Sequence, residues 1–355
     1  MNCERYFDKL FFEKLRAKYL NGELTSEQNI IKEKIDLLDG YLDELPPSDS
    51  AEYQALYNLG IDAIKKDEVA AVIVNGGMAT KFGNCVKGLV NVIDDKSFLQ
   101  IKIENIKKIC SDINAKMYVF IMNSIFTEKD TIRHFEENDY FGYDKDRIIF
   151  FNQYYFLRLT EDGEILNNDD CQVKYGCGHG DFFYAFKEFV YPDFKNTNLK
   201  YLCYSNVDNL GAYIEPAIIG YHISKNQEMT IELAEKYEYD RGGVPAVVSG
   251  RKCLIEEFKL PPTFDANKIR YFNTATYIFS FDIFKKDFEL AFYLVKKNID
   301  DVEVEQFERL AGDLSLFLST NFLKIDRRLR FHPIKTTEDL ENSRKQLKEL
   351  LKNKI

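Results

Sequence analysis

The sequence predicts an α/β protein in which helices flank a mostly parallel mixed sheet, and three observations lead to this class. Val69–Asn75 is an unbroken run of β-branched residues and alanine before a Gly-Gly pair, as expected of a strand buried on both faces of a sheet. Strand-like and helix-like runs then alternate along the chain. The length of 355 residues suits one large domain with appendages.

Residues 1–66 are predicted to form an N-terminal helical segment, and residues 67–355 the main domain. Apolar residues recur at helical spacing among charges in the first segment, namely Leu10, Phe11, Leu15, Ile31, Ile35, Leu38 and Leu42. Pro46-Pro47 ends one helix, and the serines that follow can cap the next, which runs to about Lys66.

Strands and helices of the main domain follow from the apolar patterns. The expected strands are Val69–Asn75, Met117–Met122, Ile148–Phe151, Tyr201–Ser205, Ala246–Ser249 and Thr276–Phe281. A helix is expected over 99–110, and the chain after Phe281 is expected to be largely helical. Thr336, with Asp339 three residues later, predicts the start of the last helix.

Composition excludes several classes of partner. The net charge is −10 and no basic run is present, so no nucleic acid is expected to bind. No stretch approaches the roughly 18 apolar residues of a membrane span, and the N-terminus mixes charges into its apolar residues, unlike a signal peptide. The seven cysteines form no C-x-x-C pair, which argues against a zinc site or a disulfide framework and favours the cytoplasm.

Two glycine-rich segments are candidates for ligand binding. Asn75–Gly83, followed by Lys87, begins where the buried strand ends, and ligands bind at such strand ends. Its spacing fits neither the dinucleotide nor the P-loop fingerprint, and an ordinary turn explains Gly-Gly equally well. Tyr175–Asp181 surrounds His179 with three glycines, although a functional role is the less common fate of a single histidine.

Two further segments carry charged candidates. Asp208 lies in Ser205–Gly211, directly after a strand, where a carboxylate can hold Mg²⁺ together with substrate phosphates. An Asx-turn explains the same residues equally well. Lys335 precedes the last helix, so that its ammonium and the helix N-terminus could act on one anion, although most such lysines are merely solvated.

Together these segments resemble the UDP-sugar pyrophosphorylase family, and within it the UTP–glucose-1-phosphate uridylyltransferases. The blocks that carry the resemblance occur in family order over about residues 69–340. They read NGGMATKFGNCVK, SFLQIKIENI, IMNSIFTEKDT, FNQ, GHGD, SNVDNLGA, GG, FNT and RFHPIKTTEDL. The resemblance implies a Rossmann-like, GT-A-like nucleotidyltransferase domain over 67–355. The chain ends at Ile355, soon after the last block, so no C-terminal β-helix is expected.

The resemblance also implies roles for single residues. Lys87 would reach the UTP phosphates, Lys335 would contact the reacting phosphates, and Asp208 would hold Mg²⁺. The uracil would be surrounded by Gly76, Gly77, Met122, Gln153 and Gly178. The sugar and its phosphate would be lined by His179, Asn206, Gly243, Glu256 and Asn273.

Four positions depart from the family pattern. Ala79 replaces a glycine, Val86 stands where a proline usually precedes the lysine, and Arg241 replaces a lysine. Ala275 stands where an asparagine usually follows FNT, a change that could alter the choice of sugar.

The expected reaction is an in-line attack of a sugar 1-phosphate on the α-phosphorus of UTP, catalysed by positioning and charge neutralisation. Glucose 1-phosphate is the expected acceptor, with N-acetylglucosamine 1-phosphate as the alternative. Two other readings are a nucleotide-binding regulator without turnover and a scaffold whose glycines are only turns. The oligomeric state is left open.

Overall fold

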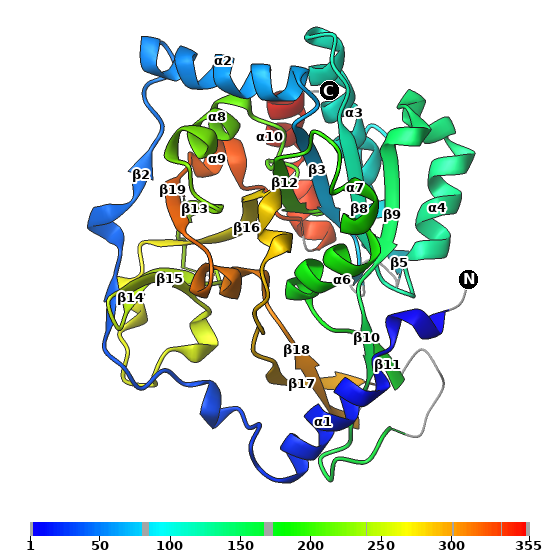
Figure 1. Ribbon diagram of the computed structural model, residues 1–355, viewed down its shortest axis with the longest axis vertical. Coiled ribbons are helices and arrows are strands. Elements are labelled where there is room, and N and C mark those ends of the chain that lie inside the picture. The colour runs from blue at the N-terminus through cyan, green and yellow to red at the C-terminus, as the bar shows by residue number, and fades with distance from the viewer. Residues whose placement is uncertain are drawn as a thin grey trace.

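A central eight-stranded sheet organises the computed structural model, which describes residues 3–79, 85–166, 173–238, 240–299, 302–334 and 336–352 (Figure 1). In spatial order its strands are β2 (Asp43–Glu44), β19 (Thr320–Lys324), β13 (Met229–Glu235), β16 (Tyr271–Ser280), β12 (Tyr201–Asn206), β3 (Val69–Val74), β8 (Tyr118–Asn123) and β9 (Ile148–Asn152). β16 is antiparallel to both neighbours and every other pair is parallel. The predicted mostly parallel mixed sheet is therefore confirmed.

Helices cover both faces of this sheet. The α-helices of the described residues are α1 (Lys9–Leu20), α2 (Ala51–Lys65), α3 (Phe98–Asp112), α4 (Glu128–Glu137), α6 (Phe182–Phe189), α7 (Tyr191–Phe194), α8 (Pro216–Lys225), α9 (Arg327–Arg330) and α10 (Thr337–Leu351). Of these, α1 packs away from the central sheet. The predicted start of the last helix is confirmed, because Thr336 and Asp339 form a reciprocal capping box.

The two faces of β3 belong to two different hydrophobic clusters. Ala71 and Ile73 pack with α2, α3, α8 and α10, whereas Ala70 and Val72 pack with the phenylalanines of α6. All four side chains are at most 3% exposed. Alternate residues of a strand point to opposite faces, so burial on both sides explains why this segment lacks polar alternation.

Smaller sheets surround the central one. β1 (Ile35–Leu37), β14 (Val244–Val248) and β15 (Arg251–Ile255) form one sheet. The paired strands are β4 (Met78–Ala79) with β5 (Cys85–Val86), β6 (Asn91–Ile93) with β7 (Lys96–Ser97), β10 (Tyr155–Leu157) with β11 (Lys174–Gly176), and β17 (Tyr293–Ile299) with β18 (Val302–Glu308). α1 lies against the last two pairs, at the end of the molecule remote from α2 (Figure 1).

Two predicted helical regions are wrong. Residues 31–42 contain β1 rather than a helix, because Ile35 and Leu37 pair with β14 and pack on its cluster. The chain after Phe281 contains β17, β18 and β19. β1 and β19 pair with strands that are distant in sequence, and such tertiary pairing overrides local helical spacing, whereas β17 and β18 pair with each other as a hairpin.

The first 66 residues are joined closely to the rest of the chain. β1 and β2 pair with strands of the main domain. α2 crosses α8 at very short range, because a Cβ on Gly60 would meet the Pro216 carbonyl oxygen at 2.0 Å. The domain boundary at residue 66 stays a prediction. No helix in the described part of the chain is long and apolar enough to cross a membrane.

Candidate active site

The predicted site residues gather at one edge of the central sheet. The strands β12, β3, β8 and β9 are parallel neighbours in the sheet. Asn75–Gly77 follows the carboxyl end of β3, Gln153 that of β9, and Asp208 that of β12. Asn206 ends β12 opposite Val74 of β3. Because β16 is antiparallel, Asn273 near its amino end lies at this edge as well, opposite Leu233. This is the edge where open α/β sheets bind ligands.

The Gln153 side chain occupies a slot between two glycines. A Cβ on Gly76 and a Cβ on Gly176 would each meet Gln153 Nε2 at 2.4 Å, so neither position has room for a side chain. Gln153 is 7% exposed, and its Oε1 has no hydrogen-bond partner in the described structure. A buried acceptor without a partner is costly, so Gln153 is a candidate for ligand recognition.

Gly176 was not predicted as a site residue, although it stands beside the predicted Gly178. Gly77 has open space around its Cβ position, as a ligand-facing backbone would. Met122, predicted at the uracil, is instead fully buried in the core. It contributes its carbonyl oxygen, which accepts the Asn75 N–H at 2.7 Å.

A buried polar network holds the Gly76–Gly77 turn. Asn75 Nδ2 donates to Asn123 Oδ1 and Thr131 Oγ1, both at 2.9 Å. A Cβ on Gly88 would meet Asn75 Oδ1 at 2.2 Å, so the network also needs a glycine there. The NSIFTEKDT block therefore supports the glycine turn from behind.

The GHGD segment is docked against Arg309–Ala311. Gly178 has a φ of +88°, which favours glycine, and a Cβ on Gly180 would meet backbone atoms of Leu310 at 2.5 Å. Asp181 forms a buried ion pair with Arg309, in which Nε lies 2.9 Å from Oδ1. Asp181 thus anchors the segment rather than facing a ligand.

His179 is oriented as a hydrogen-bond donor. Its Nδ1 accepts the Ala311 N–H at 3.1 Å, so the neutral ring carries its proton on Nε2. Burial lowers the pKa of His179 to about 4, opposed by the charge of Asp313. The imidazole is therefore neutral at pH 7.

Lys87 and Asp208, predicted to bind phosphate and metal, form an ion pair with each other. Their side chains are 21% and 13% exposed, so both are partly accessible at this edge of the sheet. The Lys87 N–H donates to the Gly77 carbonyl oxygen at 3.2 Å, which joins the cation to the glycine turn. The cleft thus brings one cation and one carboxylate together beside the Gln153 slot.

Asp208 also lies beside the segment that leads to Lys335. Asn209 Oδ1 accepts the His332 N–H at 3.0 Å, and the Asp208 carbonyl oxygen accepts the Ile334 N–H at 3.3 Å. Lys335 itself lies outside the described residues, and its role stays a prediction.

Two residues predicted to line the sugar, Gly243 and Glu256, lie together. Glu256 Oε1 would be 3.0 Å from a Cβ on Gly243 and 3.4 Å from one on Gly312. Burial raises the pKa of Glu256 to about 7, and the charge of Asp313 adds to this. A pocket of about 480 Å³ opens over Glu256 and is lined by Arg241, Gly242, Glu257 and Phe258. Gly312 belongs to no recognisable motif, so the sequence offered no signal for it.

The Asn273 side chain, by contrast, is used within the protein. Its Nδ2 donates to the Tyr277 hydroxyl at 2.6 Å, and its Oδ1 accepts the Ala275 N–H at 2.9 Å. This bond holds Ala275 at a φ of +54°, beside the register shift between β13 and β16. The Asn273 N–H also donates to the Gly243 carbonyl oxygen at 2.7 Å. Asn273 therefore shapes the backbone of the pocket.

A metal at this site would depend on the substrate for ligands. Among the described residues, no group of three or more His, Cys, Asp or Glu side chains could hold a metal ion. Asp208 supplies one carboxylate at the cleft. This set fits Mg²⁺, which keeps several waters and takes substrate phosphates as ligands, and does not fit an all-protein cage.

The chain is similar to proteins of known activity. The profile of the family described as UTP–glucose-1-phosphate uridylyltransferase matches residues 10–355. A Schizosaccharomyces pombe protein described as "Probable UTP–glucose-1-phosphate uridylyltransferase" is 28% identical over 320 residues, 83% of this chain and 62% of that protein. The Saccharomyces cerevisiae UDP-N-acetylglucosamine pyrophosphorylase is 25% identical over 348 residues, 84% of this chain and 73% of that protein.

A solved structure shows the same fold. The Leishmania major UDP-glucose pyrophosphorylase S374W mutant, in complex with UDP-glucose, superposes with a TM-score of 0.72 at 20% identity, covering 94% of this chain and 74% of that one. This confirms the predicted nucleotidyltransferase fold. The chain spans less than two thirds of the S. pombe relative. Because the family profile matches nearly the whole chain, the chain belongs to the UTP–glucose-1-phosphate uridylyltransferase family.

Proposed function

We propose that this protein transfers the uridylyl group of UTP to a sugar 1-phosphate and releases pyrophosphate. The observation that carries the proposal is the placement of the Gln153 slot beside the Lys87–Asp208 pair at one sheet edge. Gln153 contacts the glycine turn at Gly76, and the Lys87 N–H bonds the same turn at Gly77, so a base-recognising amide and a phosphate-binding cation flank one turn, as suits a nucleoside triphosphate. Membership of the family supports the same reaction.

Gln153 would recognise the uracil. Its unpartnered Oε1 can accept the N3–H of the base, and its amide nitrogen can donate to a ring carbonyl. Gly76 and Gly176 leave room for the amide alone, so the slot holds it in one plane. Gly77 would let the base approach the backbone without a side chain between them.

Lys87 and Asp208 would exchange partners when the substrates bind. In the structure the two charges neutralise each other. With UTP present, Lys87 would turn to the phosphates and leave Asp208 free. Mg²⁺ held by Asp208 and phosphate oxygens would supply positive charge that offsets the repulsion between the two substrates.

The transfer itself needs no general base. An anionic oxygen of the sugar 1-phosphate forms a bond to the α-phosphorus of UTP, and the bond from that phosphorus to the β-phosphate oxygen breaks, so that pyrophosphate leaves. His179 is neutral and donates through Nε2, which suits an orienting role toward the sugar phosphate. Glu256, beside the open pocket, would accept sugar hydroxyls.

Glucose 1-phosphate is the acceptor that we propose, with N-acetylglucosamine 1-phosphate as the second candidate. Curated relatives of both kinds match the chain. Ala275 stands where the family pattern has asparagine, and it lies beside Asn273 at this pocket. The shorter side chain leaves more room at the sugar, which keeps the second candidate open.

The direct test is pyrophosphate release with UTP and Mg²⁺ across a panel of glucose, galactose and N-acetylglucosamine 1-phosphates. We expect release with glucose 1-phosphate and a loss of roughly 100-fold in Lys87→Ala, the scale of one charge stabiliser. Lys116→Ala is the control, since Lys116 pairs with Asp144 on the surface. Tight UTP binding without release from any sugar phosphate would instead identify a nucleotide-binding regulator. Failure to bind any nucleotide would support the alternative of a scaffold whose glycines are only turns.

A further inference from the structure

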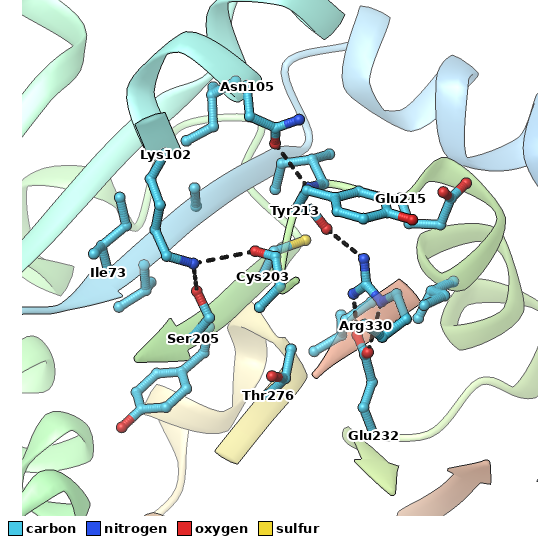
Figure 2. Close-up of a pocket in the computed structure, with 18 of the residues that line it drawn as sticks. Ile73, Lys102, Asn105, Cys203, Ser205, Tyr213, Glu215, Glu232, Thr276 and Arg330 are labelled. Carbon is cyan, nitrogen blue, oxygen red and sulfur yellow. Dashed lines mark hydrogen bonds and ion pairs between the residues drawn. The ribbon is translucent and has the colours of Figure 1, made fainter. Parts of the chain in front are cut away.

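A small cavity with charged walls lies beneath the candidate site, between α3, β12 and the segment around Arg330 (Figure 2). Its volume is about 40 Å³, enough for a water molecule. Four charged residues line its wall, Lys102, Glu215, Glu232 and Arg330. Lys102, Glu232 and Arg330 are each less than a tenth exposed. The mechanism above uses none of these three residues.

Arg330 and Glu232 satisfy one another. Arg330 Nε lies 2.9 Å from Glu232 Oε2, and Nη2 lies 2.5 Å from Oε1. The remaining arm of the guanidinium donates to the Tyr213 carbonyl oxygen at 2.7 Å (Figure 2). The Arg330–Glu232 pair joins α9 to β13, and the bond to Tyr213 joins α9 to the loop after β12. These contacts give Arg330 and Glu232 a structural role.

Lys102 is different, because its ammonium contacts neutral acceptors. Nζ lies 2.9 Å from Ser205 Oγ and 3.2 Å from the Ala212 carbonyl oxygen (Figure 2). Ser205 is the second-last residue of β12, and Ala212 follows the loop after that strand, so the two acceptors lie at the two ends of residues 206–211. That loop carries Asp208.

We propose that Lys102 is a positioning residue, which holds Asp208 in place by bonding both ends of the loop that carries it. The inference rests on the uridylyl transfer proposed above, in which Asp208 contacts the metal. Asn105, one turn along α3, supports the same stretch, since its Oδ1 accepts the Ile214 N–H at 3.1 Å. α3 thus supports the loop from the core side, opposite the contacts that Asn209 makes to the 330–334 segment.

Asp208 interacts with two lysines. It forms an ion pair with Lys87, and its carboxylate favours the charged form of the buried Lys102, although desolvation outweighs this attraction. When Lys87 turns to the triphosphate, Lys102 remains as the nearby positive charge. The groups that act on Lys102 are Asp208 and Glu232, which stabilise its charge, and Arg330, which opposes it.

A stability role explains Lys102 poorly. Desolvation lowers its pKa to about 7, so burial of the charged form costs free energy, and an apolar side chain of the same length would fill the space without this cost. What lysine adds over such a side chain is the pair of hydrogen bonds to the loop and the charge near Asp208.

The test compares Lys102→Met, Lys102→Gln and Lys107→Met. Methionine keeps the length and removes both bonds, whereas glutamine keeps a donor without the charge. Lys107 is the matched control, because it lies on α3 and its Nζ bonds a carbonyl oxygen, that of Phe141, at 3.2 Å on the surface. The measurements are hydrogen exchange of the amides of residues 206–212, the melting temperature, and kcat and KM for both substrates.

In Lys102→Met we expect exchange in residues 206–212 to accelerate by roughly tenfold or more, the scale of one hydrogen bond to a charged group. We expect kcat to fall by roughly tenfold or more while KM for the sugar phosphate changes by about twofold at most, as for a misplaced catalytic group. Lys102→Gln should recover part of both effects. Lys107→Met should resemble the wild type, and the melting temperature of Lys102→Met should not fall.

Unchanged loop exchange and kcat in Lys102→Met would overturn the inference, as would an equal change in Lys107→Met. If Lys102→Met does not fold, Lys102→Gln decides the same question. If the wild type releases pyrophosphate from no sugar phosphate, the proposed function fails, and the exchange of residues 206–212 still decides whether Lys102 holds the loop.

Discussion

An alanine at position 176 would enter the space that the Gln153 amide occupies. The new Cβ would lie 2.4 Å from Nε2 and 2.7 Å from Cδ, whereas an ordinary van der Waals contact begins at 3.4 Å. The amide would therefore have to move by about 1 Å. Room on the other side of the amide is small, because a Cβ built on Gly76 would also meet Nε2 at 2.4 Å.

The magnitude follows from what the amide does in the proposed complex. A displacement of about 1 Å takes both its donor and its acceptor out of hydrogen-bond range of the base. The loss of one or two such bonds corresponds to roughly 1–3 kcal/mol, or a rise in the UTP Kd of roughly 10- to 100-fold. Position 176 does not have a left-handed φ, so the backbone itself accepts alanine.

The assay is UTP binding by calorimetry for Gly176→Ala, Gln153→Ala and the double variant. Because both changes remove the same contact, the double variant should bind UTP no more weakly than Gln153→Ala alone, a strongly non-additive result. Gly40→Ala is the control, since nothing lies within 4 Å of its Cβ position. A UTP Kd within about twofold of the wild type in Gly176→Ala would refute the assignment of the slot.

Three further predictions concern stability and pH. Gly180→Ala should lower the free energy of unfolding by roughly 1–3 kcal/mol in urea titrations, because its Cβ meets the backbone of Leu310 at 2.5 Å. The unfolding free energy of Lys102→Met should exceed that of the wild type by most below pH 7, and the difference should shrink up to about pH 10.5. The reason is that the folded pKa of Lys102 is about 7 and its ordinary value is 10.5, so the free-energy cost of burying its charge fades between these two values. Glu256 makes the wild-type unfolding free energy change with pH in the opposite direction. Its folded pKa is about 7 against 4.5, so the wild-type unfolding free energy should fall as the pH rises from 4.5 to 7, and Glu256→Gln should remove that part of the fall.

Much of the fold could be predicted from the sequence, because the central strands are apolar on both faces. Val69–Val74, Tyr118–Asn123 and Tyr201–Asn206 are all strands where the apolar runs predicted them. β17 and β18 form a hairpin in which only β18 alternates apolar and polar residues, and β1 and β2 are only three and two residues long. β1 and β2 exist because a strand distant in sequence pairs with each of them, so local patterns did not reveal them.

For the site, the sequence determined which segments carry ligand-binding chemistry. Gly76–Gly77 and Asp208 follow the ends of β3 and β12, and parallel strands place such ends at one edge, whereas His179 stands in a glycine-rich segment after β11. These properties are local, and the tertiary structure agrees with them.

Only the tertiary structure decided which of these side chains face the cleft. It placed Met122 in the core and turned the Asn273 amide toward Tyr277, and it set Gly176 and Gly312 against Gln153 and Glu256. It also brought Lys102 beneath Asp208 from a helix more than 100 positions away in the chain. The physical reason is that a side chain's direction and its neighbours depend on packing between distant segments, which no local pattern encodes.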